Sequence, residues 1–384
     1  MRILFISQAR FPTEKAHGHQ IAQVCAAMVR LGHDVTLTAP DVRNTVLPDP
    51  QAFYDIRESF PVERLPVFDA LRAWWVPGFL AFAVTMRSYA AALRRFLPDH
   101  PADLLYTRSP RLLPVLLASG VPVALELHTL PYRRPAFVRR CNACRVVICL
   151  TQQMRDALVQ WGVDPARVIT EGDGVHPDRF CDLPSPQLAR ARWRLPSDRP
   201  VAGYVGSLVT RDNIEKGVAL LPQAFALLKK RGHPVFGWII GGPRDRIVLE
   251  KKRAQDLGLS ADDLRFEGAL SGSAVPSALA ACSVCVYPAP ASDHPFFRRD
   301  TSPLKVFEYL AAGRPTVCAD IPPLRGVLDP SLVHFFTPGD PASLADAIAE
   351  ALAHPKMNEE RRRALIEHVS WDARMRRILA FARS

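Results

Sequence analysis

The sequence has no apolar run long enough to cross a bilayer. Its longest charge-free apolar segment is AWWVPGFLAFAVTM (73–86), 14 residues interrupted by Pro77 and Gly78. A membrane-spanning helix needs about 20 residues, so this segment is too short. The first residues, MRILFISQ, resemble a buried strand and not an export signal. We therefore expect a cytoplasmic protein with reduced cysteines.

Two common nucleotide-binding motifs are also missing. The loop after the first apolar segment contains Gly18 as its single glycine, where a dinucleotide site would need G-x-G-x-x-G. The second segment ends TLTAP without the acid that would contact a ribose. No G-x-x-x-x-G-K-[ST] loop occurs. NAD binding and P-loop nucleotide hydrolysis are thus disfavoured.

The eight cysteines include two C-x-x-C pairs, Cys141/Cys144 and Cys282/Cys285. The second pair lies where a helix passes into an apolar strand, and the first lies on a basic segment without a histidine pair nearby. Structural zinc sites combine such pairs at closer spacing. We expect core and surface thiols, and no metal site.

The charge balance is basic, with 49 Lys and Arg against 38 Asp and Glu and a formal net charge of +11. Anionic partners are favoured, which include nucleic acid, anionic membranes and phosphorylated substrates. Charge alone does not choose between them. No RNA-binding motif is present, and we expect no nucleic-acid partner.

Apolar strands alternate with amphipathic helices along the chain. The residues Ile21, Val24, Cys25, Met28 and Leu31 recur at helical spacing, and Gly32 follows them as a helix end. This alternation predicts an α/β fold with parallel, doubly wound sheets. The segments expected to form strands are RILFIS, DVTLTA, DLLYT, VPVALEL, RVVICLT, VAGYVGSL, PVFGWIIGG, LRFEG, VCVYPAP, PTVCAD and LVHFFT.

A polar, proline-bearing stretch at 182–200 interrupts this alternation and predicts a domain boundary. We expect domains over 1–185 and 186–368, followed by a final helix over 369–384. Two such sheets in tandem predict a ligand-binding cleft at the carboxyl ends of their strands.

The segment TSPLKVFEYLAAG predicts a helix that begins with an anion site. Ser302 has the chemistry of an N-cap, and Pro303 that of a first helical residue. Lys305 then lies in the first turn, where a cation opposes the helix dipole by a few tenths to about 1 kcal/mol unless an anion is bound. The amides of residues 303–305, including Leu304, together with this lysine suit a pyrophosphate.

Glu308, one turn further on, suits hydroxyl groups such as a ribose diol. The alternative is an exposed Lys305–Glu308 pair that contributes little. Arg211 and Lys216 lie on the loop that leaves the first strand of the second domain, where loops face the expected cleft. A solvated basic loop is the alternative for Arg211. The two segments together favour a diphosphate site.

With these motifs in place, the chain resembles the GT-B glycosyltransferases, specifically the family-4 type of retaining nucleotide-sugar transferases. The resemblance covers nearly the whole length. It rests on HGHQIAQVCAAMVRLGHDVTL, EGDGVHPDRF, YVGSL…EKG, SPLKVFEYLAAGRPTV and the terminal SWDARM. It implies an acceptor domain, a donor domain and a final helix that crosses back to the first domain.

The resemblance also implies roles for single residues. Glu308 would bind the nucleotide ribose, and Asp300 stands where the family has an acid that touches the donor sugar. Lys216 matches the phosphate-binding lysine. Ser207 replaces a frequent arginine, for which Arg211 would substitute. The remaining implied positions are Gly18 near the diphosphate, His128 near the donor sugar and Gly242 among the nucleotide-binding residues.

The implied reaction is metal-independent and retaining, with a UDP- or GDP-sugar as donor substrate and no cofactor. A glycan or lipid-linked acceptor in cell-surface polysaccharide or glycolipid synthesis is expected. Two alternatives stay open: a nucleotide-sugar epimerase or hydrolase of the same shape, and a non-catalytic scaffold subunit.

A mixture of aromatic and basic residues between Leu65 and Leu97 bears on the acceptor. Such a mixture suits an anionic membrane surface and a lipid-linked acceptor. A core helix with a basic outer face is an equal alternative. The residues are Trp74, Trp75, Phe79 and Phe82 with Arg72, Arg87, Arg94 and Arg95, and further on Arg133, Arg134, Arg139 and Arg140.

Overall fold

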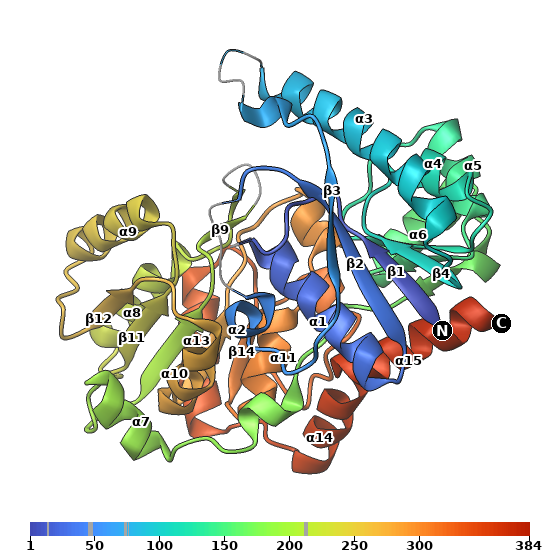
Figure 1. Cartoon of the computed structure of the whole chain (residues 1–384). Coiled ribbons are helices and arrows are strands. Elements are labelled where there is room, and N and C mark those ends of the chain that lie inside the picture. Colours follow the sequence, from blue (N-terminus) through green and yellow to red (C-terminus); the bar gives the residue numbers. More distant parts are fainter. Residues whose placement is uncertain (14, 45–48, 73–74, 76, 211–213) are drawn as a thin grey trace. The chain divides into compact units, whose positions relative to one another are not determined.

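A computed structural model describes residues 1–13, 15–44, 49–72, 75, 77–210 and 214–384 (Figure 1). The chain forms two compact units. The first comprises Met1–Asp173 and Trp371–Ser384, and the second comprises Gly174–Ser370. Each unit has a parallel sheet with helices on both faces, which confirms the expected fold class.

The first unit contains a parallel sheet in the order β3-β2-β1-β4-β5-β6-β7. Its central strands are almost wholly buried, which explains why they appear in the sequence as continuous apolar runs. The strands are β1 (Arg2–Ile6), β2 (Asp34–Asp41), β3 (Val62–Pro66), β4 (Leu104–Thr107), β5 (Val123–Leu127), β6 (Val146–Cys149) and β7 (Val168–Thr170).

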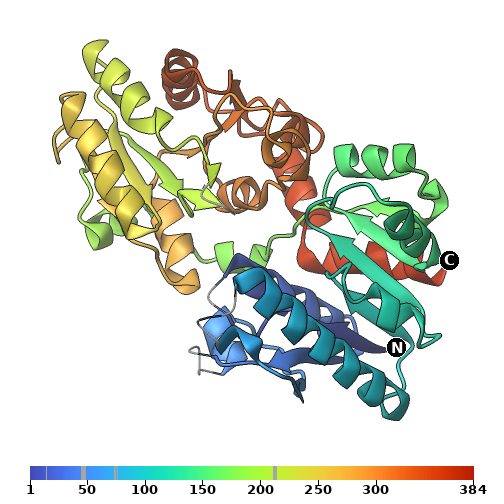
Figure 2. The same ribbon diagram turned by 90° about the horizontal axis from the view of Figure 1, so that it is seen from above.

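Helices cover this sheet on both faces. The apolar sides of α3 to α6 contribute to one core cluster with β4, β5 and β6, while α1 packs against α15 (Figure 1). Helix α3 also packs on β3, and Figure 2 shows its full length from above. The helices are α1 (Ala16–Arg30), α2 (Pro50–Tyr54), α3 (Gly78–Phe96), α4 (Leu113–Leu117), α5 (Pro135–Ala143), α6 (Gln152–Trp161) and α15 (Trp371–Arg383).

The second unit contains a parallel sheet in the order β12-β11-β8-β13-β14-β15 and a short antiparallel ribbon of β9 and β10. The ribbon lies in the loop after β8, so it extends the carboxyl end of the central strand. The strands are β8 (Val201–Val205), β9 (Val209–Thr210), β10 (Ile214–Glu215), β11 (Phe236–Ile240), β12 (Leu264–Glu267), β13 (Val284–Tyr287), β14 (Thr316–Ala319) and β15 (His334–Phe336).

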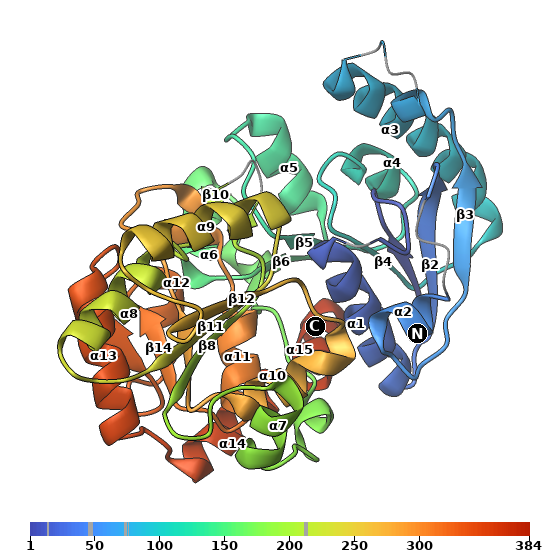
Figure 3. The same cartoon turned by 90° about the vertical axis from the view of Figure 1, so that its left-hand side faces the viewer.

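In this unit α8 and α13 pack together on one side of the sheet, and α10 and α11 lie on the other (Figure 3). The proline-bearing stretch 182–200 contains α7 and belongs to the second unit. The helices are α7 (Pro186–Trp193), α8 (Leu220–Lys230), α9 (Arg244–Asp256), α10 (Val275–Ala281), α11 (Leu304–Ala311), α12 (Pro322–Arg325), α13 (Pro341–Ala353) and α14 (Glu359–His368).

Every apolar segment expected to form a strand does so, and the short strands β3, β7, β9 and β10 are additional. Among the cysteines, Cys181 is exposed and the others are buried. Cys282 lies against Gly203 of β8, where a Cβ atom would be 2.3 Å from its sulfur, so this thiol fills a tight packing position. Within the described part of the chain, no helix combines the length and apolar character that a bilayer crossing requires.

Candidate functional site

The helix start expected at Ser302 lies slightly later in the structure. α11 begins at Leu304, with Pro303 at the N-cap position and no side-chain cap. The first amide bonded along the helix is that of Phe307, which donates to the Pro303 carbonyl at 3.1 Å. Pro303 has no N–H, so the amides open to an anion belong to residues 304–306 and not to 303–305.

Lys305, in the first turn of α11, points back towards β8. Its Nζ lies 5.0 Å from the centroid of the Tyr204 ring and 3.5 Å from the Tyr204 hydroxyl. Gly206 has a φ of +154°, a backbone conformation that favours glycine, and a Cβ atom there would also displace the end of the Lys305 side chain. Burial holds the pKa of Lys305 well below its ordinary value, and the nearby charge of Lys216 lowers it further.

Lys216 follows the β9–β10 ribbon, at the tight turn formed by Gly217, whose φ is +84°. Its neighbour Glu215 does not pair with it, because that carboxylate accepts the amides of Gly217 at 2.8 Å and Ala219 at 3.1 Å. Burial lowers the pKa of Lys216 to about 8. Its Nζ lies 6.0 Å from the Phe296 ring centroid.

The amino groups of Lys216 and Lys305 lie close enough for each charge to act on the other, and the nearby charge of Glu308 only partly opposes this effect. Neither Lys216 nor Lys305 makes an ion pair with any carboxylate among the described residues. Partly desolvated like charges are unfavourable in the unliganded state. An anion bound between the ribbon and the start of α11 would relieve this cost.

Glu308 lies one turn after Lys305 and is half-buried. The two side chains do not form an ion pair, so an exposed Lys–Glu pair is not what the structure contains. Burial raises the pKa of Glu308, while the charges of Arg179 and Lys305 act in the opposite direction. A carboxyl group held in this way can accept hydrogen bonds from hydroxyl groups of a ligand.

Asp300 ends a short π-helical turn, Phe296–Asp300, just before α11. Its side chain is buried and accepts a hydrogen bond from Arg299 Nε at 2.6 Å. The structure therefore places the acid near the start of α11 but pairs it with its neighbour. A role on the donor sugar remains a prediction.

Ser207 and Gly242 lie together at the carboxyl ends of β8 and β11. The Ser207 hydroxyl donates to the Val209 carbonyl and lies 3.5 Å from the Gly242 carbonyl. The same Gly242 carbonyl accepts the Leu208 amide at 2.8 Å. These contacts fix the loop that leads into the ribbon. Arg211 lies outside the described residues.

Gly18 lies within α1 of the first unit. A Cβ atom there would be 2.3 Å from the Tyr54 hydroxyl and 2.6 Å from the Thr13 side chain. Tyr54 in turn bonds the Thr13 backbone, accepting its amide at 2.6 Å and donating to its carbonyl at 2.8 Å. Packing inside the unit thus already requires a glycine, and its expected approach to the diphosphate remains a prediction.

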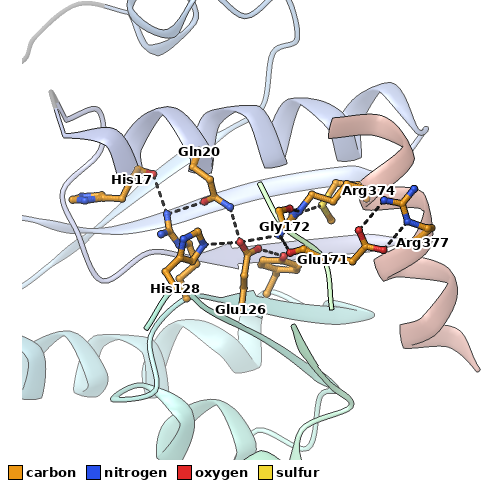
Figure 4. Close-up of polar contacts among 11 residues, drawn as sticks. His17, Gln20, Glu126, His128, Glu171, Gly172, Arg374 and Arg377 are labelled. Atoms are coloured by element: carbon orange, nitrogen blue, oxygen red, sulfur yellow. Dashed lines mark hydrogen bonds and ion pairs between the residues drawn. The ribbon is translucent and has the colours of Figure 1, made fainter. Parts of the chain in front are cut away.

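His128 follows β5 in the first unit and is held by a buried carboxylate (Figure 4). Its Nε2 lies 2.6 Å from Glu126 Oε1. Burial lowers the pKa of His128, the nearby Arg108 lowers it further, and Glu126 opposes both. The imidazole is therefore neutral near pH 7 and available as a hydrogen-bonding group.

Glu126 also receives a guanidinium from the far end of the chain. Arg374 of α15 lies 3.0 Å from Glu126 Oε1, and neither side chain is appreciably exposed (Figure 4). Burial alone would raise the pKa of Glu126, but Arg374, His128 and Arg108 hold it well below its ordinary value. Neither Glu126 nor Arg374 was predicted from the sequence as a site residue. The signal for Glu126 was a carboxylate inside the apolar run VPVALEL, which requires a buried partner.

The side chains of Glu126, His128 and Asp173 place possible ligand atoms within 4.8 Å of one another. Their surroundings do not suit a metal ion. The Glu126 oxygens already accept from Gln20, Tyr106, His128 and Arg374. Two guanidinium groups, those of Arg374 and Arg108, raise the local positive charge. This cluster is better described as a hydrogen-bonded network.

The first unit also contains a cavity of about 760 Å³ next to α1 and α3. The wall of this cavity contains both cationic and apolar side chains. Asp69 is the acidic residue among the described residues that line it. The cationic lining residues are Arg10, Lys15, Arg43 and Arg72, and the apolar ones are Ala9, Pro40, Val42, Leu71, Phe82 and Met86.

Exposed aromatic side chains precede α3 and lie at its start, in the segment that also contributes Leu71, Arg72 and Phe82 to this cavity. Trp75 and Phe79 are 73% and 74% exposed, and Phe68 is 69% exposed. The arginines expected beside them, Arg72, Arg87, Arg94 and Arg95, are exposed as well. The surrounding α3 residues Thr85, Met86, Tyr89 and Leu93 are buried, so α3 is a core helix that also presents an apolar and basic outer side. Trp74 lies outside the described residues.

Comparison with known proteins agrees with this architecture. Residues 18–179 match the family model described as Glycosyltransferase Family 4, and residues 199–354 match the one described as Glycosyl transferases group 1. No curated protein sequence matches the chain.

Similar solved structures share the fold over the full length. Sucrose-phosphate synthase from Thermosynechococcus elongatus is 19% identical with a TM-score of 0.74, and the match covers 100% of this chain and 98% of that one. Anabaena HepE, solved with UDP and glucose, is 18% identical with a TM-score of 0.71 and full coverage of both chains. A Burkholderia xenovorans trehalose-phosphate synthase, solved with glucose 6-phosphate, is 16% identical with a TM-score of 0.72 and the same coverage.

The Glycosyltransferase Family 4 model matches the first unit, which contains the His128 network. The Glycosyl transferases group 1 model matches the second unit, which contains Lys216 and Lys305. The chain is a GT-B glycosyltransferase of the family-4 type.

Proposed function

We propose that this glycosyltransferase transfers a hexosyl group, with retention of configuration, from a nucleoside diphosphate sugar. The observation that carries the proposal is the partly desolvated pair formed by Lys216, which follows the β9–β10 ribbon, and Lys305 at the start of α11. A diphosphate supplies the two adjacent negative charges that such a pair lacks. The UDP and UDP-glucose in the HepE structures support this choice of ligand.

The main task in this reaction is to stabilise the departing diphosphate. Lys216, Lys305 and the amides of residues 304–306 would do so in a partly desolvated environment, where charge interactions are strengthened. Glu308 would accept hydrogen bonds from the ribose hydroxyls. The family resemblance assigns Asp300 and His128 to contacts with the donor sugar. With retention, the leaving phosphate itself helps to remove the acceptor proton.

We further propose that no divalent metal or other cofactor takes part. The positive charge that a metal would supply to a diphosphate is supplied by the two lysines. The candidate ligand cluster around Glu126 is occupied by guanidinium and amide donors, which do not suit a cation. Activity that survives chelation by EDTA would support this, and activity lost on chelation and restored by Mg²⁺ or Mn²⁺ would contradict it.

For the acceptor we propose a glycan joined to a lipid through a phosphate or diphosphate, at the surface of an anionic membrane. The first-unit cavity combines cationic side chains for the phosphate with an apolar wall, formed in part by Leu71 and Phe82. The same segment of the chain carries the exposed aromatic residues Phe68, Trp75 and Phe79 and the exposed arginines of α3. Apolar groups that enter the interface together with basic residues are typical of peripheral membrane binding.

The donor is tested by calorimetry with UDP and GDP, followed by incubation of the protein with nucleotide sugars and lipid-phosphate acceptors. We expect one diphosphate to bind and the matching sugar to be transferred with its anomeric configuration retained, as seen by NMR. Epimerised or hydrolysed donor without transfer would indicate the epimerase or hydrolase alternative. Binding of neither nucleotide would favour the scaffold.

A further inference from the structure

The buried carboxylate of Glu126 joins four elements of the first unit (Figure 4). Gln20 of α1 donates to Oε1 at 2.6 Å, and Tyr106 of β4 donates to Oε2. The other two partners are His128, which follows β5, and Arg374 of α15. The carboxylate is 0% exposed, so these four groups replace its hydration.

This arrangement determines where the proton of His128 lies. An ionised carboxylate can only accept hydrogen bonds, so the 2.6 Å contact with Glu126 requires a proton on Nε2. In a neutral imidazole the other nitrogen, Nδ1, then carries a lone pair. None of the described residues bonds to Nδ1, and the His128 side chain is 14% exposed. Nδ1 is thus available to accept a hydrogen bond from a ligand.

Arg374 decides whether this state persists. With Arg374 present, the charge of Glu126 is balanced by a guanidinium at 3.0 Å. Without it, the buried carboxylate would have an unbalanced charge, and the nearest group able to take up a proton is His128. An imidazolium would donate from Nδ1 and could no longer accept.

We propose that Arg374 is a positioning residue: through Glu126 it keeps His128 neutral with the proton on Nε2, so that Nδ1 accepts a hydrogen bond from a sugar hydroxyl. The final helix α15 thereby contributes to the chemistry of the first unit and not only to its packing. The link to a sugar hydroxyl rests on the proposed function. The protonation state of His128 does not, and it can be measured without substrate.

The guanidinium is anchored firmly enough for this role. Arg374 Nε donates to the Gly172 carbonyl at 2.5 Å, and Nη2 lies 3.4 Å from the Glu171 carbonyl. On the other side of His128, Arg108 donates to Gln20 Oε1 at 2.7 Å and to the His17 carbonyl at 3.2 Å. The charged and titratable groups that face His128 are Glu126, Arg108 and Asp173, with Arg374 and Tyr106 acting on Glu126.

The test uses the full chain labelled with 15N-histidine and follows His128 by two-dimensional NMR between pH 5 and 9, with a His128→Gln variant to assign its signal. We expect a neutral ring at pH 7 with the proton on Nε2. A His128 that is charged at pH 7, or that carries its single proton on Nδ1, would overturn the proposal even if no variant folds.

Three variants separate positioning from packing. Arg374→Gln should raise the pH at which His128 becomes charged, and Arg374→Lys should restore the wild-type titration in part. Arg377→Gln is the matched control, because Arg377 lies on the same helix and pairs with Glu171 at 2.6 Å without touching Glu126. It should leave His128 unchanged. A folded Arg374→Gln protein with an unchanged His128 titration would contradict the proposal.

Transfer activity gives the second measurement. Arg374→Gln should lower kcat/KM by roughly tenfold at pH 7, the usual effect of losing one hydrogen bond to the substrate, and less at higher pH, where His128 is again neutral. UDP binding should not change, because the lysine pair lies in the other unit. If the His128 titration shifts as expected but activity does not change, the proposed hydrogen bond between His128 and a sugar hydroxyl is refuted. If UDP does not bind to the wild type, the result instead contradicts the proposed use of a UDP-sugar as donor.

Discussion

At the scale of single residues, the lowered pKa of Lys216 makes diphosphate binding depend on pH. Its ammonium loses a proton as the pH rises through about 8, and the pKa of Lys305 is shifted in the same direction. UDP or GDP should therefore bind more weakly above pH 8, by up to roughly tenfold per pH unit, and binding there should take up a proton. Calorimetry in buffers of different ionisation enthalpy measures both effects.

A substitution isolates the contribution of Lys216. Lys216→Met should weaken binding at pH 7 by about 10–100-fold, the effect of losing a hydrogen bond to a charged group, and should flatten the pH dependence. Lys230→Met, which alters an exposed lysine at the end of α8, is the control. Equal affinity at pH 7 and pH 9.5 in the wild type would show that the ammonium groups do not bind the phosphates.

Glu308 should recognise the ribose. Glu308→Ala should lose about tenfold or more in affinity for the nucleoside diphosphate, because hydrogen bonds to a charged acceptor contribute about 1.5–3 kcal/mol. The variant should also fail to distinguish the nucleotide from its 2′,3′-dideoxy form, which the wild type binds more weakly. Glu367→Ala, at an exposed position of α14, should behave like the wild type. Unchanged affinity in Glu308→Ala would refute the ribose contact.

Local sequence explains why some site residues could be predicted and others could not. The helix start around Lys305 is encoded within a few neighbouring residues, so its dipole and proline chemistry can be read from the sequence. The partner of Glu126 is Arg374, whose position near it depends on how the final helix folds back. Gly206 shows the same limit, because the clash it avoids is with Lys305 of a distant segment.

At the scale of the elements, α15 is held to the first unit by an ion pair with no exposed surface. Arg374→Met should lower the free energy of unfolding of this unit by about 3–5 kcal/mol, since it leaves a buried charge unpaired. Combining it with Glu126→Gln should recover part of the loss. Arg377→Gln should cost less than Arg374→Met, because the Arg377 side chain is 32% exposed and water can partly replace it at Glu171.

Urea unfolding followed by circular dichroism measures these differences. An Arg374→Met protein as stable as the wild type would mean that a proton taken up by His128 or by Glu126 itself replaces the guanidinium at no appreciable cost. In that case the ion pair would not account for the docking of α15.

The outer side of α3 should bind anionic membranes. Replacing Trp75 and Phe79 by Ser should reduce sedimentation with vesicles containing phosphatidylglycerol by about tenfold or more, because each large apolar side chain contributes about 1.5–3 kcal/mol when buried. Stability should change little, since both side chains are exposed. The control is Val248→Ser, at an exposed position of α9 in the second unit. Wild-type protein that does not sediment with these vesicles would exclude the membrane role.

Most elements were predictable because buried parallel strands appear as continuous apolar runs. β3 was missed because most of its residues, such as Glu63 and Arg64, are exposed, and β7, β9 and β10 were missed because they have only two or three residues each. The outer side of α3 could not be assigned from composition alone. A core helix and a membrane-binding helix share the same mixture of aromatic and basic residues, and the sequence does not show which of these side chains are exposed.

At the scale of the whole molecule, two units with separate cores should unfold in two steps. A diphosphate that binds through Lys216 and Lys305 should stabilise the second unit by about 2.7 kcal/mol at a ligand concentration of 100 Kd. The midpoint temperature of the unfolding step of that unit should rise accordingly. Arg374→Met should instead lower the midpoint of the unfolding step that belongs to the first unit. Differential scanning calorimetry with and without UDP or GDP resolves the two steps, and a single transition that the ligand shifts as a whole would show that the units unfold as one.

The first unit is also not continuous in sequence, since it contains Met1–Asp173 together with Trp371–Ser384. During translation, Glu126 leaves the ribosome long before Arg374, and at about 5–20 residues per second the whole second unit is made in the interval. For that time the first unit holds a carboxylate in its core without its guanidinium partner. A ribosome that stops before residue 371 would therefore release a chain whose second unit can fold and whose first unit lacks its final helix, a natural target for proteolysis.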